Sequence, residues 1–389
     1  MSFSVDEVRF LAAHAEEIAE VEPSLGLSRK TVFGDRALLE ARFGDAARAA
    51  LELASARKAG GEKFPAGWLV DADAAQQATP AAVSEVRAAR LRSHGITFVH
   101  DVTCSIGTEA PAVRNAGMEW LGSDIDPVRL LMARHNLGPG AWLARADALQ
   151  PVSTLGAVVA DPARRADGRR ITDPAKLLPP LPSLVDTYAG RELAVKCAPG
   201  IDYSQWSGLV SVVSANGGVK EACLYTPGLS GGIRREAVVL RGSGAGGEGL
   251  DCERINDSAS DDVDVTGPGS YIIEPDGAVI RAGLVRHWAH RHGLTMLDEH
   301  IAFLTGPAVP PGHTGFPYLE TVPVKKLRVA LQAHDAGSVE ILVRGVDIDP
   351  DRLRAKLKLK GPAKNLRGVI IARVGSGAVA YICGPRERG

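Results

Sequence analysis

The sequence predicts a doubly wound α/β sheet over residues 94–242, with a helical region before it and a smaller α+β domain after it. Short apolar runs alternate with helical stretches from Phe98 to Leu240, which is the pattern of parallel strands joined by helices. Acids follow four of these strands. The chain has 389 residues, 45% of them hydrophobic, which is enough for two or three domains with a buried core.

Residues 3–55 show helical periodicity without strands, within a helical N-terminal region predicted over residues 1–93. We expect a first helix up to Glu20 and a second helix over residues 35–56. Thr79 and Pro80 are typical of a cap followed by the first helical position, so a third helix should start there. Residues 57–71 are expected to form a glycine-containing basic loop, so residues 1–93 are predicted to be a helical region that this loop interrupts.

The sheet is expected to contain eight strands, each a short apolar run bounded by glycine, proline or polar residues. The predicted strands are residues 97–101, 118–123, 141–144, 156–160, 191–196, 208–213, 220–225 and 236–240. The turn sequence Asn216-Gly217-Gly218 predicts a hairpin at the edge of the sheet.

The chain changes in composition after the sheet. Residues 243–267 are rich in Gly, Ser and Asp, and nine acids stand against a single Arg over residues 245–276, so an exposed acidic linker is expected. Residues 268–389 are predicted to form the α+β domain, with a helix over residues 278–292. The end of this domain is basic, with twelve Lys and Arg against five acids over residues 323–373.

Composition excludes several classes of protein. Net charge is −1, so charge alone identifies no partner. The five cysteines form no Cys-x-x-Cys pair, which argues against a zinc site and a disulfide framework. The first residues have no basic stretch followed by an apolar run, and no apolar run approaches about 18 residues, so neither a signal peptide nor a membrane span is expected. We expect a cytoplasmic protein without a bound metal.

Acids at successive strand ends predict a nucleoside-type cofactor along one edge of the sheet. Asp101 ends the first strand, and the turn after it contains Ser105 and Gly107, whose small size lets a ligand approach the backbone. Asp124 follows the second strand and is placed to accept both ribose hydroxyls. Asp147 follows the third strand and can accept the exocyclic amine of adenine.

The same stretch argues against a dinucleotide cofactor. Residues 105–110 contain one of the three glycines of the Gly-x-Gly-x-x-Gly fingerprint. Glu109 would also repel a pyrophosphate. The cofactor is therefore expected to be uncharged where it meets this turn.

This order of motifs resembles the class I S-adenosylmethionine-dependent methyltransferases, which have a Rossmann-like sheet. The segment from Val99 to Gly107 is similar to the first motif of the family. There the glycine contacts the methionine moiety, the second acid the ribose and the third acid the adenine. The resemblance implies S-adenosylmethionine as cofactor, held by Asp101, Ser105, Gly107, Asp124, Asp147 and Ala148. Ser105 departs from the pattern, since the family usually has glycine there.

Residues 73–80 are similar to the segment that covers the cofactor in trimethylguanosine-synthase-like methyltransferases. The resemblance implies that Gln76 and Thr79 line the site. The alternative is that the segment only begins a capped helix.

The sequence Asp161-Pro162-Ala163-Arg164 follows the fourth strand, where this fold presents residues to the methyl acceptor. Amino-methylating nucleic-acid enzymes have Asp/Asn-Pro-Pro-aromatic here: the acid or amide accepts from the target amine, and the ring stacks on the base. Arg164 replaces the aromatic residue. Arginine can stack on a base, pair with a phosphate or form a salt bridge across the site. The candidate catalytic residues are Asp161, Pro162 and Arg164.

A second resemblance concerns Cys197. RNA 5-methyluridine methyltransferases have Asp-Pro-Pro-Arg after the fourth strand and a nucleophilic cysteine after the next one. Cys197 could likewise add to a pyrimidine ring before methyl transfer. We favour the alternative, an ordinary buried cysteine at a strand end, and therefore favour an amine nitrogen over pyrimidine C5.

The C-terminal domain resembles the THUMP-like domain attached to a bacterial group of methyltransferases. The matching segments are residues 271–275, 304–306, 343–350 and 357–361. True THUMP domains bind RNA, so the resemblance implies RNA as partner. Arg352, Lys356, Lys358 and Lys360 alternate along one stretch and offer phosphate contacts. The alternative is a solvated helix face, which is the commoner use of such a run.

The sequence therefore predicts an S-adenosylmethionine-dependent methyltransferase that acts on an RNA base. Two alternatives stay open. A methyltransferase of a small metabolite would leave the basic C-terminal domain with a structural role. A non-catalytic RNA-binding protein with a degenerate cofactor site would account for Ser105 and for the missing aromatic residue at position 164.

Overall fold

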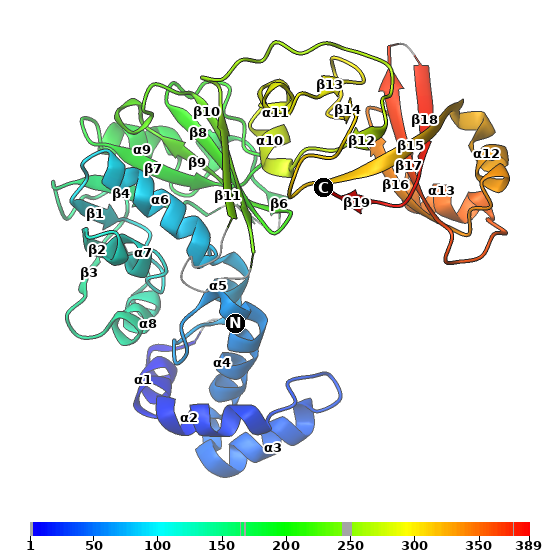
Figure 1. The fold of residues 1–389 in the computed structure, drawn as a ribbon. Coiled ribbons are helices and arrows are strands. Elements are labelled where there is room, and N and C mark those ends of the chain that lie inside the picture. Colours follow the sequence, from blue (N-terminus) through cyan, green and yellow to red (C-terminus); the bar gives the residue numbers. More distant parts are fainter. Residues whose placement is uncertain (1–2, 164, 167–168, 243–250, 376) are drawn as a thin grey trace. The chain divides into compact units, whose positions relative to one another are not determined.

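The computed structural model describes residues 3–163, 165–166, 169–242, 251–375 and 377–389, and Figure 1 labels its elements. The chain forms two compact units. The first comprises Met1–Arg234 and Val238–Glu253, and the second comprises Arg235–Ala237 and Arg254–Gly389. The helical region and the α/β sheet thus lie together in the first unit.

The first unit begins with helices. They are α1 (Val5–Ala13), α2 (Ala15–Val21), α3 (Val32–Phe43), α4 (Ala47–Gly60), α5 (Ala72–Gln77) and α6 (Ala81–Ser93), followed within the sheet region by α7 (Ala110–Asn115), α8 (Pro127–Leu137) and α9 (Leu181–Thr187). Ser4 caps α1: its Oγ accepts from the Glu7 N–H at 3.2 Å, and the Glu7 carboxylate accepts from the Ser4 N–H at 2.8 Å.

The two long helices expected at the N-terminus are each divided. The helix expected up to Glu20 breaks at His14 and continues as α2. The helix expected over residues 35–56 is instead α3 and α4, because Gly44 has a φ of +54° and ends α3.

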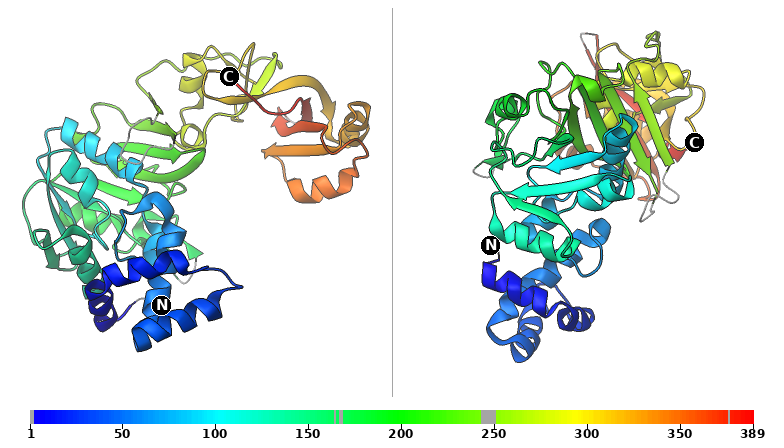
Figure 2. Two further views of the ribbon diagram at one scale, coloured as in Figure 1. Left: turned by 60° about the horizontal axis from the view of Figure 1, so that its bottom comes forward. Right: turned by 90° about the vertical axis from the view of Figure 1, so that its left-hand side faces the viewer.

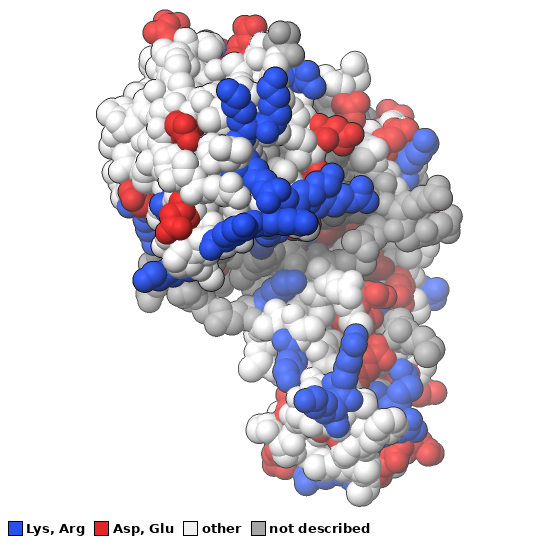
Figure 3. Space-filling view, turned by 90° about the vertical axis from the view of Figure 1, so that its right-hand side faces the viewer, with Lys and Arg blue, Asp and Glu red and all other residues white. Residues whose placement is uncertain are grey.

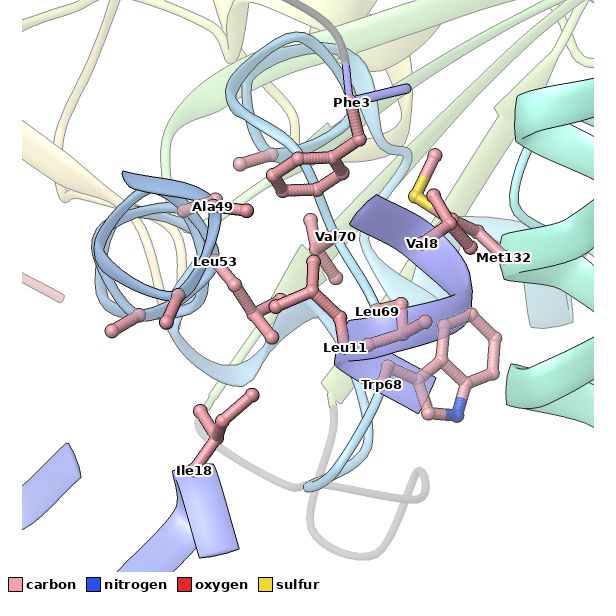
Figure 4. Packing of buried hydrophobic residues seen from close by; sticks show 14 of the residues in the cluster. Phe3, Val8, Leu11, Ile18, Ala49, Leu53, Trp68, Leu69, Val70 and Met132 are labelled. Carbon is pink, nitrogen blue, oxygen red and sulfur yellow. The ribbon is translucent and has the colours of Figure 1, made fainter. Parts of the chain in front are cut away.

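A hydrophobic cluster joins the N-terminal helices to α8 (Figure 4). Leu11 of α1 and Leu53 of α4 are buried in it together with Val70. Met132 of α8 belongs to the same cluster. Since α8 follows strand β2 (Glu119–Asp124), the cluster packs the helical region against the sheet.

The sheet of the first unit has nine strands in the order β11-β10-β8-β9-β7-β4-β1-β2-β3. They are β1 (Phe98–Asp101), β2 (Glu119–Asp124), β3 (Trp142–Arg145), β4 (Ala157–Ala160), β7 (Leu193–Cys197), β8 (Leu209–Ala215), β9 (Gly218–Tyr225), β10 (Arg235–Arg241) and β11 (Asp251–Asn256). The neighbours β3, β2, β1, β4 and β7 run parallel, whereas β9 is antiparallel to β7 and β8. All eight predicted strands are present, and the doubly wound sheet is confirmed. A separate ribbon pairs β5 (Arg165–Ala166) with β6 (Arg169–Arg170).

The far edge of this sheet contains the predicted hairpin and a strand that was not expected. Asn216 and Gly217 join β8 to β9 with φ of +50° and +77°, as a tight hairpin turn requires. β11 lies within the expected acidic linker, so that expectation is wrong for these residues. Arg241 of β10 pairs with Asp251 at 3.3 Å and with Glu253 at 2.7 Å, which gives two of the acids a partner along the edge.

The second unit contains helices and an eight-stranded sheet with the path β13-β14-β12-β15-β18-β17-β16, in which β19 also pairs with β15. The elements are β12 (Tyr271–Ile273), α10 (Gly277–Arg281), α11 (Val285–Arg291), β13 (Thr295–Met296), β14 (Leu304–Gly306), β15 (Thr314–Pro323), α12 (Leu327–Ala333), β16 (Ser338–Arg344), α13 (Pro350–Leu357), β17 (Leu366–Val374), β18 (Gly377–Cys383) and β19 (Glu387–Arg388). The helix expected over residues 278–292 is divided between α10 and α11 near Gly283, whose φ is +75°.

Both faces of this second sheet are covered. Leu331 of α12 and Leu357 of α13 pack with Ile371 on one face. Figure 2 shows the ribbons of these two helices in orange beside the strands of this sheet. Ile370, which points to the other face, packs with Phe303. Among the residues that the structure describes, no helix is long and apolar enough to cross a membrane.

Candidate active site

Three of the predicted site acids lie at the same edge of the first sheet. Asp101 ends β1 and stands opposite Gly122 of β2 and Val159 of β4 in the parallel register. Asp124 ends β2, and Asp161 directly follows β4. Because these strands are parallel, their carboxyl ends meet, which is where open α/β sheets bind ligands.

The turn after β1 has a backbone that few side chains would fit. Ser105 has a φ of +48°, a region that glycine adopts without strain, and its N–H donates to Asp124 Oδ2 at 2.9 Å. Gly107 has a φ of +90°, and a Cβ on it would lie 2.6 Å from Leu137 Cδ1. The turn therefore presents backbone, not side chains, at this edge.

Asp124 is held by two backbone donors. Its Oδ2 accepts from Ser105, and its Oδ1 accepts from the Asp126 N–H at 2.9 Å. Burial raises the pKa of Asp124. A carboxylate has about four acceptor positions, so each oxygen keeps capacity for one hydroxyl of a ligand. Asp126 caps α8 by accepting from the Val128 N–H at 2.8 Å.

The segment from Asp71 to Thr79 is tied to the sheet region at both ends. Asp71 caps α5, and its Oδ1 lies 2.7 Å from Arg129 Nη1 on α8. Thr79 Oγ1 donates to Glu221 Oε2 of β9 at 3.2 Å. The expected capping role of Thr79 is wrong: Pro80 is the N-cap residue of α6, and it provides no side-chain hydrogen bond.

Of the residues expected to contact the adenine or to cover the cofactor, Asp147 and Ala148 accept hydrogen bonds within the protein, whereas the Gln76 side chain is exposed. Asp147 is exposed and accepts from the Leu149 N–H at 2.9 Å. The carbonyl oxygen of Ala148 accepts from the Tyr188 hydroxyl at 2.7 Å. Gln76 lies exposed on α5. Asp147 and Gln76 therefore present polar side chains that solvent can reach.

Asp161 lies at the end of the sheet edge where the methyl acceptor is predicted. Its N–H donates to Thr103 Oγ1 at 2.6 Å, and its Oδ2 lies 2.9 Å from Lys196 Nζ. The Asp161 side chain is 28% exposed, whereas Pro162 is buried. Arg164 lies outside the described residues, so its expected role stays a prediction.

A buried network of charges lies behind Asp161. Glu109 accepts from Lys196 Nζ at 3.1 Å and from Arg87 Nη2 at 2.8 Å, and Arg87 also pairs with Glu221. The expectation that Glu109 faces the ligand is wrong, because it is buried and paired. Burial alone would raise the pKa of Glu109, but Arg87 and Lys196 hold it well below its usual value.

Asp101 is fully enclosed beside this network. Burial raises its pKa to about 8, and the negative charge of Glu109 adds to the shift. Its Oδ1 accepts from the Thr103 N–H at 3.3 Å. Thr103 thereby connects Asp101 to Asp161 through its backbone and its hydroxyl.

Cys197 is completely buried in β7, where it stands opposite Ala222 of β9. A nucleophile that adds to a base needs an open face. This position therefore agrees with the interpretation as a buried strand cysteine.

The network was not predicted, although the sequence contains a signal for part of it. Lys196 interrupts the apolar run Leu193–Cys197, and Arg87 stands between Val86 and Ala88 on the buried side of α6. A long cation in such a place is rarely buried without a partner. The identity of the partners depends on pairing across α6, β7 and β9, which spacing alone does not reveal.

Known proteins match both units. Residues 313–385, in the second unit, match the family described as THUMP domain-like. Relatives from two strains of Mycobacterium tuberculosis, CDC 1551 and H37Rv, are described as uncharacterized S-adenosylmethionine-dependent methyltransferases. Each is 48% identical over 370 residues, which cover 89% of this chain and 99% of the relative. The chain belongs to this family of S-adenosylmethionine-dependent methyltransferases.

A solved structure supports the fold of this methyltransferase. A Porphyromonas gingivalis W83 protein, provisionally assigned as a methyltransferase, superposes with a TM-score of 0.69 at 18% identity and covers 99% of both chains. At that identity the likeness concerns the fold alone. The cofactor of this methyltransferase family is S-adenosylmethionine. Its methionine moiety and ribose suit a backbone-lined turn next to a two-oxygen acceptor such as Asp124.

Proposed function

We propose that this methyltransferase transfers a methyl group to an amine nitrogen of an RNA base. The observation that carries the proposal is Asp161: a carboxylate directly after β4, fixed by Lys196 and partly open to solvent. A carboxylate there can accept a hydrogen bond from an amine and leave its nitrogen directed at the methyl donor.

Cofactor binding would use the other strand ends. Asp124 would accept the two ribose hydroxyls, and the backbone at Ser105 and Gly107 would contact the methionine moiety. Asp147 and Ala148 would lie at the adenine. These roles are supported by the shared edge of β1, β2 and β3, at which all of these residues lie.

Two more residues would close the cofactor site. Gln76 and Thr79 lie on the segment that is tied to α8 through Asp71 and to β9 through Glu221. In that arrangement Thr79 would act through the anchor it gives the segment, whereas Gln76, which is exposed, would meet the ligand. Asp101 would contribute an uncharged, hydrogen-bonded floor.

The chemical step requires positioning more than activation, since the sulfonium of the cofactor already carries a good leaving group. The bond from sulfur to the methyl carbon breaks as the bond from that carbon to nitrogen forms. The sulfonium becomes a thioether, and the methylated nitrogen releases its proton to the Asp161 carboxylate and then to water. Pro162 keeps the backbone after Asp161 stiff.

RNA is supported as the acceptor by the second unit. The THUMP domain-like match covers residues 313–385, and this stretch is basic. Figure 3 shows Lys and Arg side chains gathered in a band across the upper part of the surface that it presents. Lys356, Lys358 and Lys360, at and after the end of α13, are exposed. An RNA acceptor would place the enzyme in the cytoplasm.

Transfer of a tritiated methyl group tests the proposal. Wild-type protein and an Asp161→Ala variant are incubated with labelled S-adenosylmethionine and RNA from a strain that lacks the gene. Label should enter RNA with the wild type and fall at least about 100-fold with the variant. Label that enters a small-molecule extract and never RNA would contradict the assignment of RNA. Equal transfer by both proteins would contradict the role of Asp161.

A further inference from the structure

We propose that Lys196 is a positioning residue that fixes the Asp161 carboxylate at the acceptor edge, and that Glu109, Arg87 and Glu221 hold Lys196 in place. The inference rests on the proposed role of Asp161. The buried charged residues would then have a function in orienting Asp161, although the family motifs did not point to them.

Lys196 bridges two carboxylates of different exposure. Its Nζ lies 2.9 Å from Asp161 Oδ2 and 3.1 Å from Glu109 Oε1. The Asp161 side chain is 28% exposed, while those of Lys196 and Glu109 are 4% exposed. The ammonium therefore reaches the site from within the protein, and the substrate would meet the carboxylate and not the lysine.

Glu109 is fixed on its other side by Arg87 of α6. Arg87 Nε donates to Glu109 Oε2 at 3.1 Å and Nη2 donates to Oε1 at 2.8 Å, so the guanidinium binds both oxygens. Ser84 Oγ also donates to Oε1 at 3.1 Å. Two-point pairing of this kind fixes direction as well as distance. Glu109 thus offers Lys196 a rigid counter-charge.

Glu221 of β9 completes the series. It pairs with Arg87 and accepts from Thr79 Oγ1 at 3.2 Å. The charges alternate from Asp161 through Lys196, Glu109 and Arg87 to Glu221. Burial alone would lower the pKa of Lys196, but Asp161 and Glu109 raise it above its usual value, so Lys196 stays a cation.

The backbone of Asp161 has a separate anchor. Its N–H donates to Thr103 Oγ1 at 2.6 Å, and this bond does not involve Lys196. Removal of Lys196 should therefore leave the backbone in place while the Asp161 carboxylate loses its contact with the Lys196 ammonium. The cofactor contacts proposed for Asp124 lie on β2 and should not change. These two points separate a positioning role from a general contribution to folding.

The test compares Lys196→Met with Lys196→Arg, which restores the cation. We expect Lys196→Met to bind S-adenosylmethionine within about threefold of wild type in calorimetry, and to lower kcat for RNA about 100-fold, the effect of misplacing a reacting group by about 1 Å. Lys196→Arg should recover part of kcat. The acid limb of the pH–rate profile should move to higher pH in Lys196→Met, since the Asp161 carboxylate, without the Lys196 charge and with the Glu109 carboxylate still nearby, is protonated more easily.

A double variant tests whether Lys196 acts through Asp161. Lys196→Met combined with Asp161→Ala should be no slower than Asp161→Ala alone. Arg57→Met is the matched control, because it removes an ion pair of similar length, 2.7 Å from Arg57 Nη1 to Glu22 Oε1, among the N-terminal helices. It should lower Tm and leave kcat and the pH profile unchanged. Additive losses in the double variant, or a pH profile that Lys196→Met leaves in place, would overturn the proposal.

A measurement without substrate separates this inference from the proposed function. Carbon-13 NMR of aspartate carboxyls, assigned with Asp161→Ala, follows the ionisation of Asp161 directly. The Asp161 signal should titrate at higher pH in Lys196→Met than in wild type or Lys196→Arg. If this shift is seen and no RNA accepts a methyl group, the proposed function fails and the Lys196 contact stands. If the three titrations coincide, the Lys196 inference fails whatever the substrate.

Discussion

Gly107 shows at the scale of one residue how the cofactor turn is constrained. Its φ of +90° is a backbone conformation that side chains rarely adopt, and a Cβ on it would lie 2.6 Å from Leu137 Cδ1, so that Leu137 would have to shift. We predict that Gly107→Ala destabilises the protein by more than about 2 kcal/mol and weakens S-adenosylmethionine binding at least tenfold. Urea unfolding and calorimetry measure the two effects.

The control for this variant is Gly190→Ala. Gly190 also has a positive φ, +82°, but a Cβ there meets nothing within 4 Å. Gly190→Ala should lower the free energy of unfolding by about 1 kcal/mol, because alanine is strained at a positive φ, and should leave cofactor affinity unchanged. Equal effects of the two substitutions would contradict the close contact with Leu137.

Asp101 gives a prediction about pH. Its pKa is about 8 in the folded protein, so between about pH 4 and 8 the folded state binds a proton that the unfolded state lacks. The stability that protonated Asp101 contributes is fully present below the pKa that Asp101 has in the unfolded chain. It is lost as pH rises toward 8, at up to about 1.4 kcal/mol per pH unit. Asp101→Asn should therefore gain stability relative to wild type as pH rises from 5 to 8 in urea unfolding.

Asp45→Asn is the control for that experiment, since Asp45 is an exposed carboxyl between α3 and α4. Its stability should run parallel to that of the wild type over the same pH range. A parallel curve for Asp101→Asn as well would show that Asp101 ionises normally in the folded state.

The residues whose place at a strand end the sequence predicted and the residue whose direction it misjudged differ in a physical way. Asp101, Asp124 and Asp161 lie at the ends of parallel strands, and strand ends can be read from an apolar run followed by an acid. Glu109 is close to Gly107 in sequence, but its side chain turns inward to Arg87. Adjacency along a chain does not say which way a side chain in a turn points, so the buried network needed the tertiary structure.

The elements were predictable where apolar periodicity governs them. The parallel strands follow from runs such as Ala157–Ala160. Helix breaks at Gly44 and Gly283 were missed because a single glycine is tolerated inside many helices. β11 was missed because its exposed edge carries polar and acidic residues, and its apolar signal is confined to Ile255.

Thr79 provides a prediction for the segment that joins α5 to α6. Its hydroxyl anchors the segment to Glu221 at 3.2 Å and does not cap α6. Thr79→Val should cost about 1–2 kcal/mol in unfolding experiments, because a buried acceptor loses its donor, and should weaken S-adenosylmethionine binding several-fold. Thr79→Ser keeps the hydroxyl and should restore both. Tight cofactor binding by Thr79→Val would show that the anchor does not hold the cofactor cover.

At the scale of the whole molecule, a net charge of −1 conceals a basic C-terminal stretch. We predict that replacing Lys356, Lys358 and Lys360 together by Ala weakens RNA binding. The slope of log affinity against log salt concentration should become less steep by about 2, as expected for three lost phosphate contacts. Filter binding over a range of salt concentrations measures this slope.

The matched control replaces three cations that already have acidic partners. Arg9, Arg36 and Arg42 pair with Asp6, Glu40 and Glu20 on exposed helix surfaces. Their joint replacement by Ala removes the same formal charge. It should leave the RNA affinity and the salt slope unchanged. Equal losses in both triple variants would show that RNA responds only to total charge.

The most direct test of the account is mass spectrometry of RNA nucleosides from a strain without the gene, complemented with wild type or Asp161→Ala. We predict that one base methylated on an amine nitrogen disappears in the deletion strain, returns with the wild-type gene and stays absent with Asp161→Ala. An unchanged nucleoside profile, a lost C5-methylated pyrimidine, or full recovery with Asp161→Ala would contradict it.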